Sequence, residues 1–184
     1  MKKVSFTAMK DGTKDEYLFL DKLEKEYISG TGERIIKYLR QYDETIEGYQ
    51  ISRLEHSLQA STRALRDKAS DEMVVATLLH DIGDDLAPAN HAEYAAAILR
   101  PYVSEKTYWI LLKHGEFQMF YYAHYLGADK NKRDQYKNHE YYKDCVKFCE
   151  IWDQSSFDPN YKSLKLEEFE PLLKKIFSRK PYTS

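Results

Sequence analysis

The stretch that decides the fold is residues 73–85, MVVATLLHDIGDD. The uncharged run from Met73 to Leu79 has the length and composition of a buried helix, and the glycine and paired aspartates that follow end it. Asp71, just before the run, is the expected N-cap. His80 and Asp81 therefore stand at the end of a buried helix, where both side chains project from its terminus and not from a solvated face.

Helical periodicity extends from this segment over most of the chain. Glycine and proline are few, at 7 and 5 of 184 residues, and apolar residues recur at spacings of three and four. We expect an all-α protein, a single-domain helical bundle over residues 1–184, because 42% hydrophobic residues in this length fill one core and leave little for a second. The predicted helices span residues 14–28, 32–42, 50–67, 71–80, 88–101, 104–114, 140–154 and 166–177.

The outer helices are expected to pack on a central part of the bundle. This central part covers about residues 46–154, with the segments 14–42 and 166–177 packed on it. The polar segment 129–139 is nearly free of aliphatic residues, so we expect a surface excursion or an irregular helix there.

Charge and composition limit the partners. The net charge of −2 comes from interspersed acids and bases, which predicts neither nucleic-acid polymer binding nor an anionic membrane surface. No run reaches the roughly 18 apolar residues of a membrane span, so we expect a cytoplasmic protein with a small-molecule partner. Cys145 and Cys149 have helical spacing and match neither a disulfide framework nor a thiolate zinc site.

Four histidines and two aspartates are distributed over successive predicted helices. A single histidine on an apolar face is usually a core imidazole bonded to a backbone carbonyl, and a His-Asp pair is common by chance. Six such residues in one small bundle are harder to explain in that way. Imidazole and carboxylate suit first-row transition metals. The candidate metal ligands are His56, His80, Asp81, His91, His114 and Asp153.

These residues resemble the HD-domain metalloenzymes, in which a first His, a His-Asp pair and a distant Asp bind metal on a helical bundle. The resemblance covers about residues 46–154, and two further histidines between the pair and the last Asp mark the dinuclear version. It implies two ions bridged by Asp81, one on His56, His80 and Asp153 and the other on His91 and His114.

Three motifs are most similar to the oxygenase branch of this superfamily: LEHSLQ at 54–59, LLHDIG at 78–83 and WDQ at 152–154. That branch includes myo-inositol oxygenase and enzymes that cleave hydroxylated aminoalkylphosphonates, which use a mixed-valent diiron centre and dioxygen. The resemblance implies an Fe(II)/Fe(III) dioxygenase that cleaves a small hydroxylated substrate with O₂. The alternative is a phosphohydrolase or phosphodiesterase acting on a nucleotide or other phosphate ester with Mn, Mg or another divalent ion. A non-catalytic binding module is disfavoured because no ligand position is missing.

The same resemblance indicates further catalytic residues. The phosphonate-cleaving enzymes have a Tyr and then a Glu before the first metal His, whereas here Glu47 precedes Tyr49. Asp84 stands where they have a substrate-contacting His, and Glu150 where they have an Arg. We therefore do not expect a phosphonate substrate here, because acidic residues that face the site would favour a neutral polyol or a cationic group. It is equally expected that these acidic residues lie on the solvated surface and do not affect the substrate.

The remaining candidates surround the ligands. The predicted catalytic residues are Asp81, Glu47, Tyr49, Asp84 and Gln154. Gln154 and Gln59 are expected to hydrogen-bond a metal-bound ligand. Arg53 and Glu55 are expected to orient the His56 imidazole. The hydrolase alternative requires a phosphate-binding cation near the metals, from Lys113, Arg100 or the basic cluster at 130–137.

Overall fold

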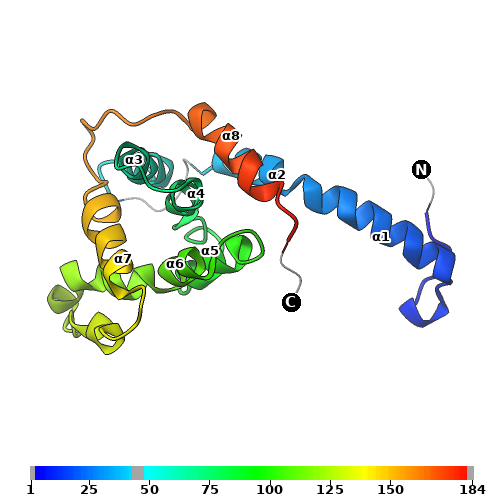
Figure 1. Ribbon diagram of the computed structural model, residues 1–184, viewed down its shortest axis with the longest axis horizontal. Helices are drawn as coiled ribbons and strands as arrows, with labels where there is room; N and C mark the ends of the chain where they lie inside the picture. The colour runs from blue at the N-terminus through cyan, green and yellow to red at the C-terminus, as the bar shows by residue number, and fades with distance from the viewer. Residues whose placement is uncertain (1–2, 43–47, 182–184) are drawn as a thin grey trace.

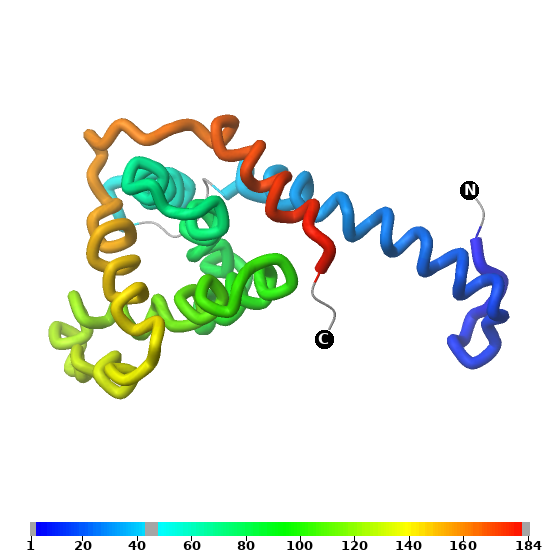
Figure 2. The backbone as a smooth tube through the Cα atoms, in the orientation of Figure 1, coloured from blue at the N-terminus to red at the C-terminus, as the bar shows by residue number. Residues whose placement is uncertain are grey.

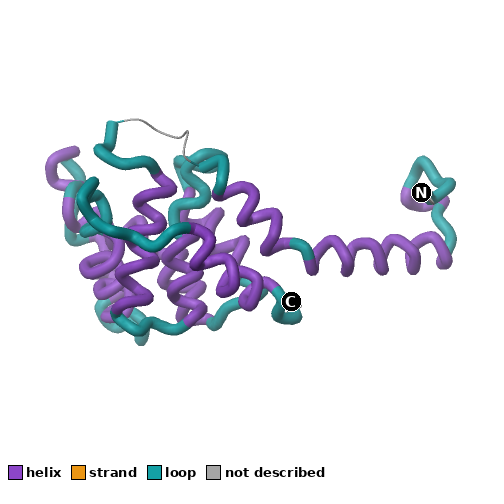
Figure 3. The backbone as a smooth tube through the Cα atoms, turned by 90° about the horizontal axis from the view of Figure 1, so that it is seen from above, coloured by secondary structure: helices purple, strands orange, loops and turns teal. Residues whose placement is uncertain are grey.

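The computed structural model describes residues 3–42 and 48–181, so the predicted catalytic residue Glu47 lies outside the described residues. Over these ranges the chain forms eight α-helices and no strand (Figures 1 and 3), which confirms the all-α prediction. The helices are α1 (Lys14–Ser29), α2 (Thr31–Leu39), α3 (Arg53–Arg66), α4 (Asp71–Leu79), α5 (His91–Leu99), α6 (Glu105–Gln118), α7 (Tyr142–Lys147) and α8 (Leu166–Phe177).

Helix α4, uncharged after its first two residues, lies at the centre of the bundle. Every residue from Met73 to Leu79 is buried, and α3, α6 and α8 pack against it. The helix begins one residue earlier than its predicted cap implies: the Ser70 hydroxyl accepts the Met73 N–H, and Asp71 is the first helical residue. An apolar helix without a polar face must be covered on all sides, and this places its C-terminal His80 inside the molecule.

Helices α5 and α6 form an antiparallel pair beside α4 (Figure 1). Helix α6 was predicted to stop before Gly115 but continues to Gln118, because tertiary packing on both sides outweighs the modest helix penalty of one glycine. Helix α7 is followed directly by a π-helical segment, Phe148–Asp153. Together they occupy most of the range 140–154, for which a single long helix was predicted.

The polar segment 129–139 is an irregular surface layer, as predicted, with one 3₁₀ helix at Lys132–Tyr136. It nevertheless carries aromatic rings that cover the core. His139 stacks on Trp109 with ring centroids 4.0 Å apart, and Tyr136 stacks on Phe117. The aromatic residues of this region therefore extend the core more than they line a site.

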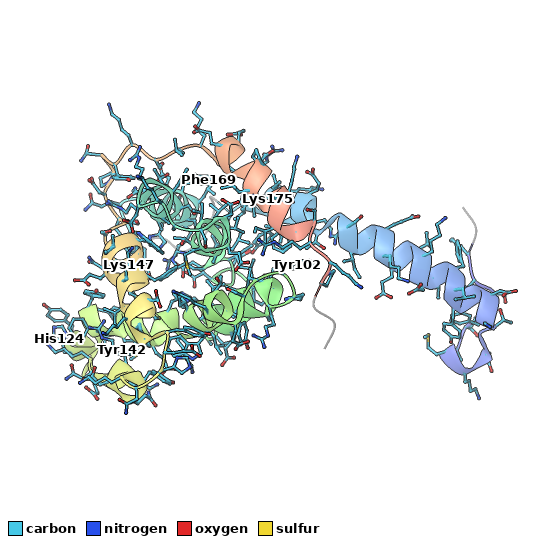
Figure 4. All side chains as sticks on the ribbon, in the orientation of Figure 1. Tyr102, His124, Tyr142, Lys147, Phe169 and Lys175 are labelled. Carbon is cyan, nitrogen blue, oxygen red and sulfur yellow. The ribbon has the colours of Figure 1, made fainter. Side chains whose placement is uncertain are left out.

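Helix α1 leaves the body of the molecule and projects into open space, with α2 as its main neighbour (Figures 1 and 2). None of its residues is buried, and its described side-chain contacts are with the segment before it, through Tyr17 and Glu16, and with α2, through Tyr27 (Figure 4). The expectation that the whole segment 14–42 packs on the core is therefore wrong for α1. Helices α2 and α8 do pack on each other and on α4 or its neighbours. Within the described ranges, no helix has the length and apolarity needed to cross a bilayer.

Candidate metal centre

Five separate elements bring the six predicted ligands into one cluster. His56 lies in the second turn of α3, His80 caps the C-terminus of α4, and Asp81 follows it in the turn. His91 is the first residue of α5, His114 lies in α6, and Asp153 ends the π-helical segment. All except the partly exposed His91 are buried. The packing of α3, α5, α6 and α7 around the end of α4 thus assembles the site.

One group of donor atoms gathers around His56 and His80. The two Nε2 atoms lie 3.0 Å apart, and each is 3.4 Å from Asp81 Oδ2. Asp153 Oδ1 lies 3.4 Å from the Nε2 of His56 and 3.6 Å from that of His80. Two imidazoles and two carboxylates therefore converge on a single point.

A second group uses the other carboxylate oxygen of Asp81. Asp81 Oδ1 lies 3.5 Å from Nε2 of His91 and 3.4 Å from Nε2 of His114. The ligand atoms of these three residues lie within 4.8 Å of one another, as do those of His56, His80 and Asp81. Asp81 is thus shared by two adjacent donor groups.

Backbone carbonyls fix which ring nitrogen of each buried histidine faces the cluster. Nδ1 of His56 lies 2.9 Å from the Ser156 carbonyl oxygen, Nδ1 of His80 lies 2.7 Å from that of Thr77, and Nδ1 of His114 lies 2.6 Å from that of Leu111. A carbonyl oxygen only accepts, so each Nδ1 carries a proton and donates it. The Nε2 atoms that face the cluster are therefore the nitrogens available to bind a cation.

The spacing of the donor atoms fits a first-row metal ion. With metal–ligand bonds of about 2.1 Å, neighbouring ligands of one ion lie about 3.0–3.4 Å apart. The separations in both groups range from 3.0 to 3.6 Å. His56, His80, Asp81, His91 and His114 can thus hold metal ions, with Asp153 beside the first group.

The electrostatics of the cluster also favour a cation. Burial raises the pKa of Asp81 and of Asp153, but His80 and the hydrogen-bonded histidines outweigh burial and hold both pKa values below the usual range. Burial lowers the pKa of His56, yet its bonds to Asp153 and Asp81 raise it to about 10. The two carboxylates thus favour a positive charge among the imidazoles, which a proton on His56 or a bound metal ion supplies.

Asp84, a predicted catalytic residue, lies directly behind the second group. Its Oδ1 is 3.3 Å from His91 Nδ1, and its Oδ2 is 3.0 Å from Arg53 Nη2. Arg53 also reaches Asp81 Oδ2 at 3.4 Å. Burial and the Asp81 charge raise the pKa of Asp84 above that of an ordinary carboxyl group, while Arg53 and His91 oppose this. Asp84 therefore orients His91 in the way that carboxylates orient metal-bound histidines.

A cavity of about 340 Å³ opens on the cluster. Four predicted catalytic residues line it, Asp81, Asp84, Tyr49 and Gln154; Gln154 also donates to the Glu150 carbonyl. Three further lining residues have polar groups, Gln118, Tyr121 and Tyr122. The volume suits a small molecule.

Sequence reasoning missed Phe157, and the expected roles of Arg53, Glu55 and Gln59 differ in the structure. Arg53, expected to orient His56, pairs instead with Asp81 and Asp84. Phe157 stacks on His56 at 4.3 Å and on Tyr49 at 5.0 Å, and no periodic signal marks it because it lies in a loop. Glu55 forms the capping box of α3 with Ser52 and does not contact the imidazole. The amide of Gln59 is engaged by the backbone of Asp158, so it does not reach the cluster.

The cations that the hydrolase alternative requires lie elsewhere. Lys113 pairs with Glu116, and Arg100 pairs with Glu105. Lys132 and Lys137 pair with Glu116 and Asp134. Among the described residues that line the cavity, Arg53 is the one arginine or lysine, and it is held by Asp81 and Asp84.

Comparisons with known proteins add no family to this geometry. No protein-family model matches the chain, and no curated protein matches it at a significant level. What is established is an all-α bundle in which two adjacent histidine and aspartate groups, joined by Asp81, can hold metal ions.

Proposed function

We propose that this protein is a dinuclear metalloenzyme of the HD type that acts as an oxygenase on a small hydroxylated substrate. The observation that carries the proposal is the position of Asp81, which presents one carboxylate oxygen to His56 and His80 and the other to His91 and His114. A bridging carboxylate between two sets of imidazoles is the arrangement of a dinuclear centre. The sequence resemblance to mixed-valent diiron oxygenases supports iron as the metal.

Two adjacent ions, when bound, would polarise a substrate hydroxyl group and supply electrons to dioxygen. The chain's own residues would position that substrate. Gln118 donates to Asp153 Oδ1 at 3.1 Å, and its buried Oε1 has no partner within the protein. This oxygen is placed to accept a hydrogen bond from a substrate hydroxyl or amine in the cavity. Phe157, stacked on His56, closes one wall against water.

The side chains of the cavity favour a hydroxylated substrate over a phosphate ester. Arg53 is the one lysine or arginine among the described residues that line it, and it is committed to Asp81 and Asp84. A phosphate ester would therefore depend on the metal ions alone for its positive partners, because no free side-chain cation is available to its outer oxygens. A polyol or a hydroxylated amine instead offers hydrogen-bond donors to Gln118 and to the tyrosine hydroxyls.

Metal analysis with low-temperature EPR tests the centre. Protein purified anaerobically from iron-supplemented cells should contain about two irons per chain and, after partial oxidation, give a mixed-valent signal. Asp81→Ala should lose the signal. Asp85→Asn is the matched control, because Asp85 accepts from Tyr38 and does not contact the cluster; it should retain both ions.

Turnover then separates the two enzyme classes. Substrate-dependent O₂ uptake with a panel of polyols and hydroxylated amines is expected. Protein without iron that is activated by Mn or Mg and hydrolyses nucleotides or model phosphate esters would overturn the oxygenase and support the phosphohydrolase. Retention of both ions in Asp81→Ala would overturn the dinuclear centre itself.

A further inference from the structure

The projecting helix α1 carries an apolar stripe that stays largely open among the described residues, with Arg34 over the Tyr27 ring. Leu20, Leu23 and Tyr27 follow one another at spacings of three and four, which places them on one helix face. Leu23 is 42% exposed and Tyr27 is 66% exposed. An isolated helix of this length is only marginally stable in water, so an unpacked apolar stripe on a projecting helix indicates a partner.

An apolar groove begins where α1 meets the body. It has a volume of about 220 Å³ and is lined mainly by apolar atoms of α2, of the turn after Asp81 and of α5. Its lining includes Ile35, Tyr38, Leu86 and Ile98. Leu86 is 62% exposed, which shows that the groove is open to an incoming apolar side chain.

The stripe and the groove form one continuous surface. The helical spacing of the stripe carries on from Tyr27 through Thr31 to Ile35 and Tyr38. Arg34, which also lines the groove, stacks over the Tyr27 ring at 3.8 Å and so joins the two. From Leu20 to Tyr38 this surface is about 28 Å long at 1.5 Å per helical residue.

The junction between α1 and α2 prevents α1 from covering its own groove. Arg34 Nη1 donates to the Tyr27 carbonyl at 2.7 Å, and the Thr31 hydroxyl donates to the Ile28 carbonyl at 2.7 Å. Gly30 ends α1 at φ −85° and ψ 7°, outside the helical region, and the two bonds hold α2 in place immediately after it. Folding back would require a reversal at this glycine and the loss of both bonds, so the occupant must come from another molecule.

We propose that the occupant is a second copy of this chain, in a two-fold dimer in which each α1 lies in the groove of the other copy. A two-fold axis near Gly30 makes the arms antiparallel and places Leu20 and Leu23 of one copy against Tyr38 and Ile35 of the other. The surface is self-complementary, as an isologous interface requires, because each copy supplies one exposed stripe and one open groove.

Charge also matches in this arrangement. Glu24 flanks the stripe, whereas Arg34 and Lys37 lie beside the groove, so antiparallel arms bring acidic and basic side chains together. Because a two-fold axis repeats every contact, the exchange covers both stripes and both grooves at once.

Sedimentation equilibrium tests the dimer without reference to metal or activity. The wild-type chain should be a dimer at tens of micromolar, and Leu23→Glu and Leu86→Glu should each raise the dissociation constant roughly 100-fold or more, as charges placed in an apolar interface do. Leu126→Glu is the matched control, because Leu126 is 76% exposed and lies away from both surfaces. Circular dichroism verifies that each variant is helical.

Disulfide trapping provides a second test that does not depend on a destabilising variant. Both native cysteines are buried, so Leu23→Cys protein mixed with Leu86→Cys protein should form a mixed disulfide between unlike copies. A wild-type chain that is still monomeric at about 100 μM would overturn the proposal, because a stable dimer dissociates only at much lower concentrations. A second outcome would also overturn the proposal: a dimer that persists in Leu86→Glu protein, together with disulfides that form only between two Leu23→Cys chains. In that case the two α1 helices would pair with each other and not with the groove.

Discussion

Replacing Gly83 by alanine should displace the start of α5 and weaken the second donor group. A Cβ at Gly83 would lie 2.8 Å from both the Cα and the carbonyl oxygen of His91 and 3.0 Å from Tyr94 Cβ. The first two neighbours are backbone atoms, so the helix itself must move by several tenths of an ångström. His91 Nε2, now 3.5 Å from Asp81 Oδ1, would move with it.

Overpacking of this kind costs about 1–3 kcal/mol, which for a chain of this size lowers the melting temperature by about 2–12 °C. Gly115→Ala is the control: it lies inside α6, its Cβ would meet His91 and Ala92 at 3.7–3.8 Å, and helix propensity should stabilise the protein by about 0.5–1 kcal/mol. Thermal melts of metal-free protein measure the change in stability of both variants, and titration with Co²⁺ measures the metal affinity of the two donor groups. Equal melting temperatures for the two variants would refute the close-approach argument.

Three more outcomes follow from particular contacts. Asp84→Asn removes the charge that holds His91 Nδ1 and should weaken the second metal site by about 10–100-fold, with the first site little changed, as measured by metal titration. Glu72 accepts a hydrogen bond from the Ser104 N–H and is paired with Arg179, and these contacts outweigh burial and lower the pKa of Glu72. The ionised Glu72 therefore stabilises the folded protein above the ordinary Glu pKa of 4.5, and this stabilisation is lost as the pH falls below that value. Glu72→Gln should cost about 1 kcal/mol at neutral pH and flatten this acid loss in denaturant melts at several pH values. Cys145 and Cys149 are buried, and burial raises the thiol pKa of Cys149, so a thiol reagent should react with neither in the native protein and with both in denaturant; rapid native reaction would contradict their burial.

The helices could be predicted closely because their signals are local. The bounds of α8 match the prediction at both ends, and α4 begins within one residue of it. The errors arise where tertiary contacts override a local signal. Gly115 was taken as a helix end, yet α6 continues past it, and the π-helical turn before Asp153 leaves no mark in the spacing of apolar residues.

The ligand set could be predicted because each ligand has a distinctive side chain, whereas the groups that orient the ligands could not. The protons on His56, His80 and His114 are directed by the carbonyls of Ser156, Thr77 and Leu111, and any residue type supplies a carbonyl. Tyr42 donates to the Asp81 carbonyl from a distant helix end, which is a contact that only the fold reveals.

Helix α1 shows the limit of amphipathic patterns most clearly. The spacing of Leu20, Leu23 and Tyr27 indicates that one face of the helix must be covered, but it does not say by what. The prediction assigned that cover to the protein's own core, since this is the usual case for a single domain. In the fold, the stripe instead continues into an open groove at the junction of α1 and α2. Within residues 3–42 and 48–181 this apolar face remains largely uncovered, and a second copy of the chain would cover the face on both copies.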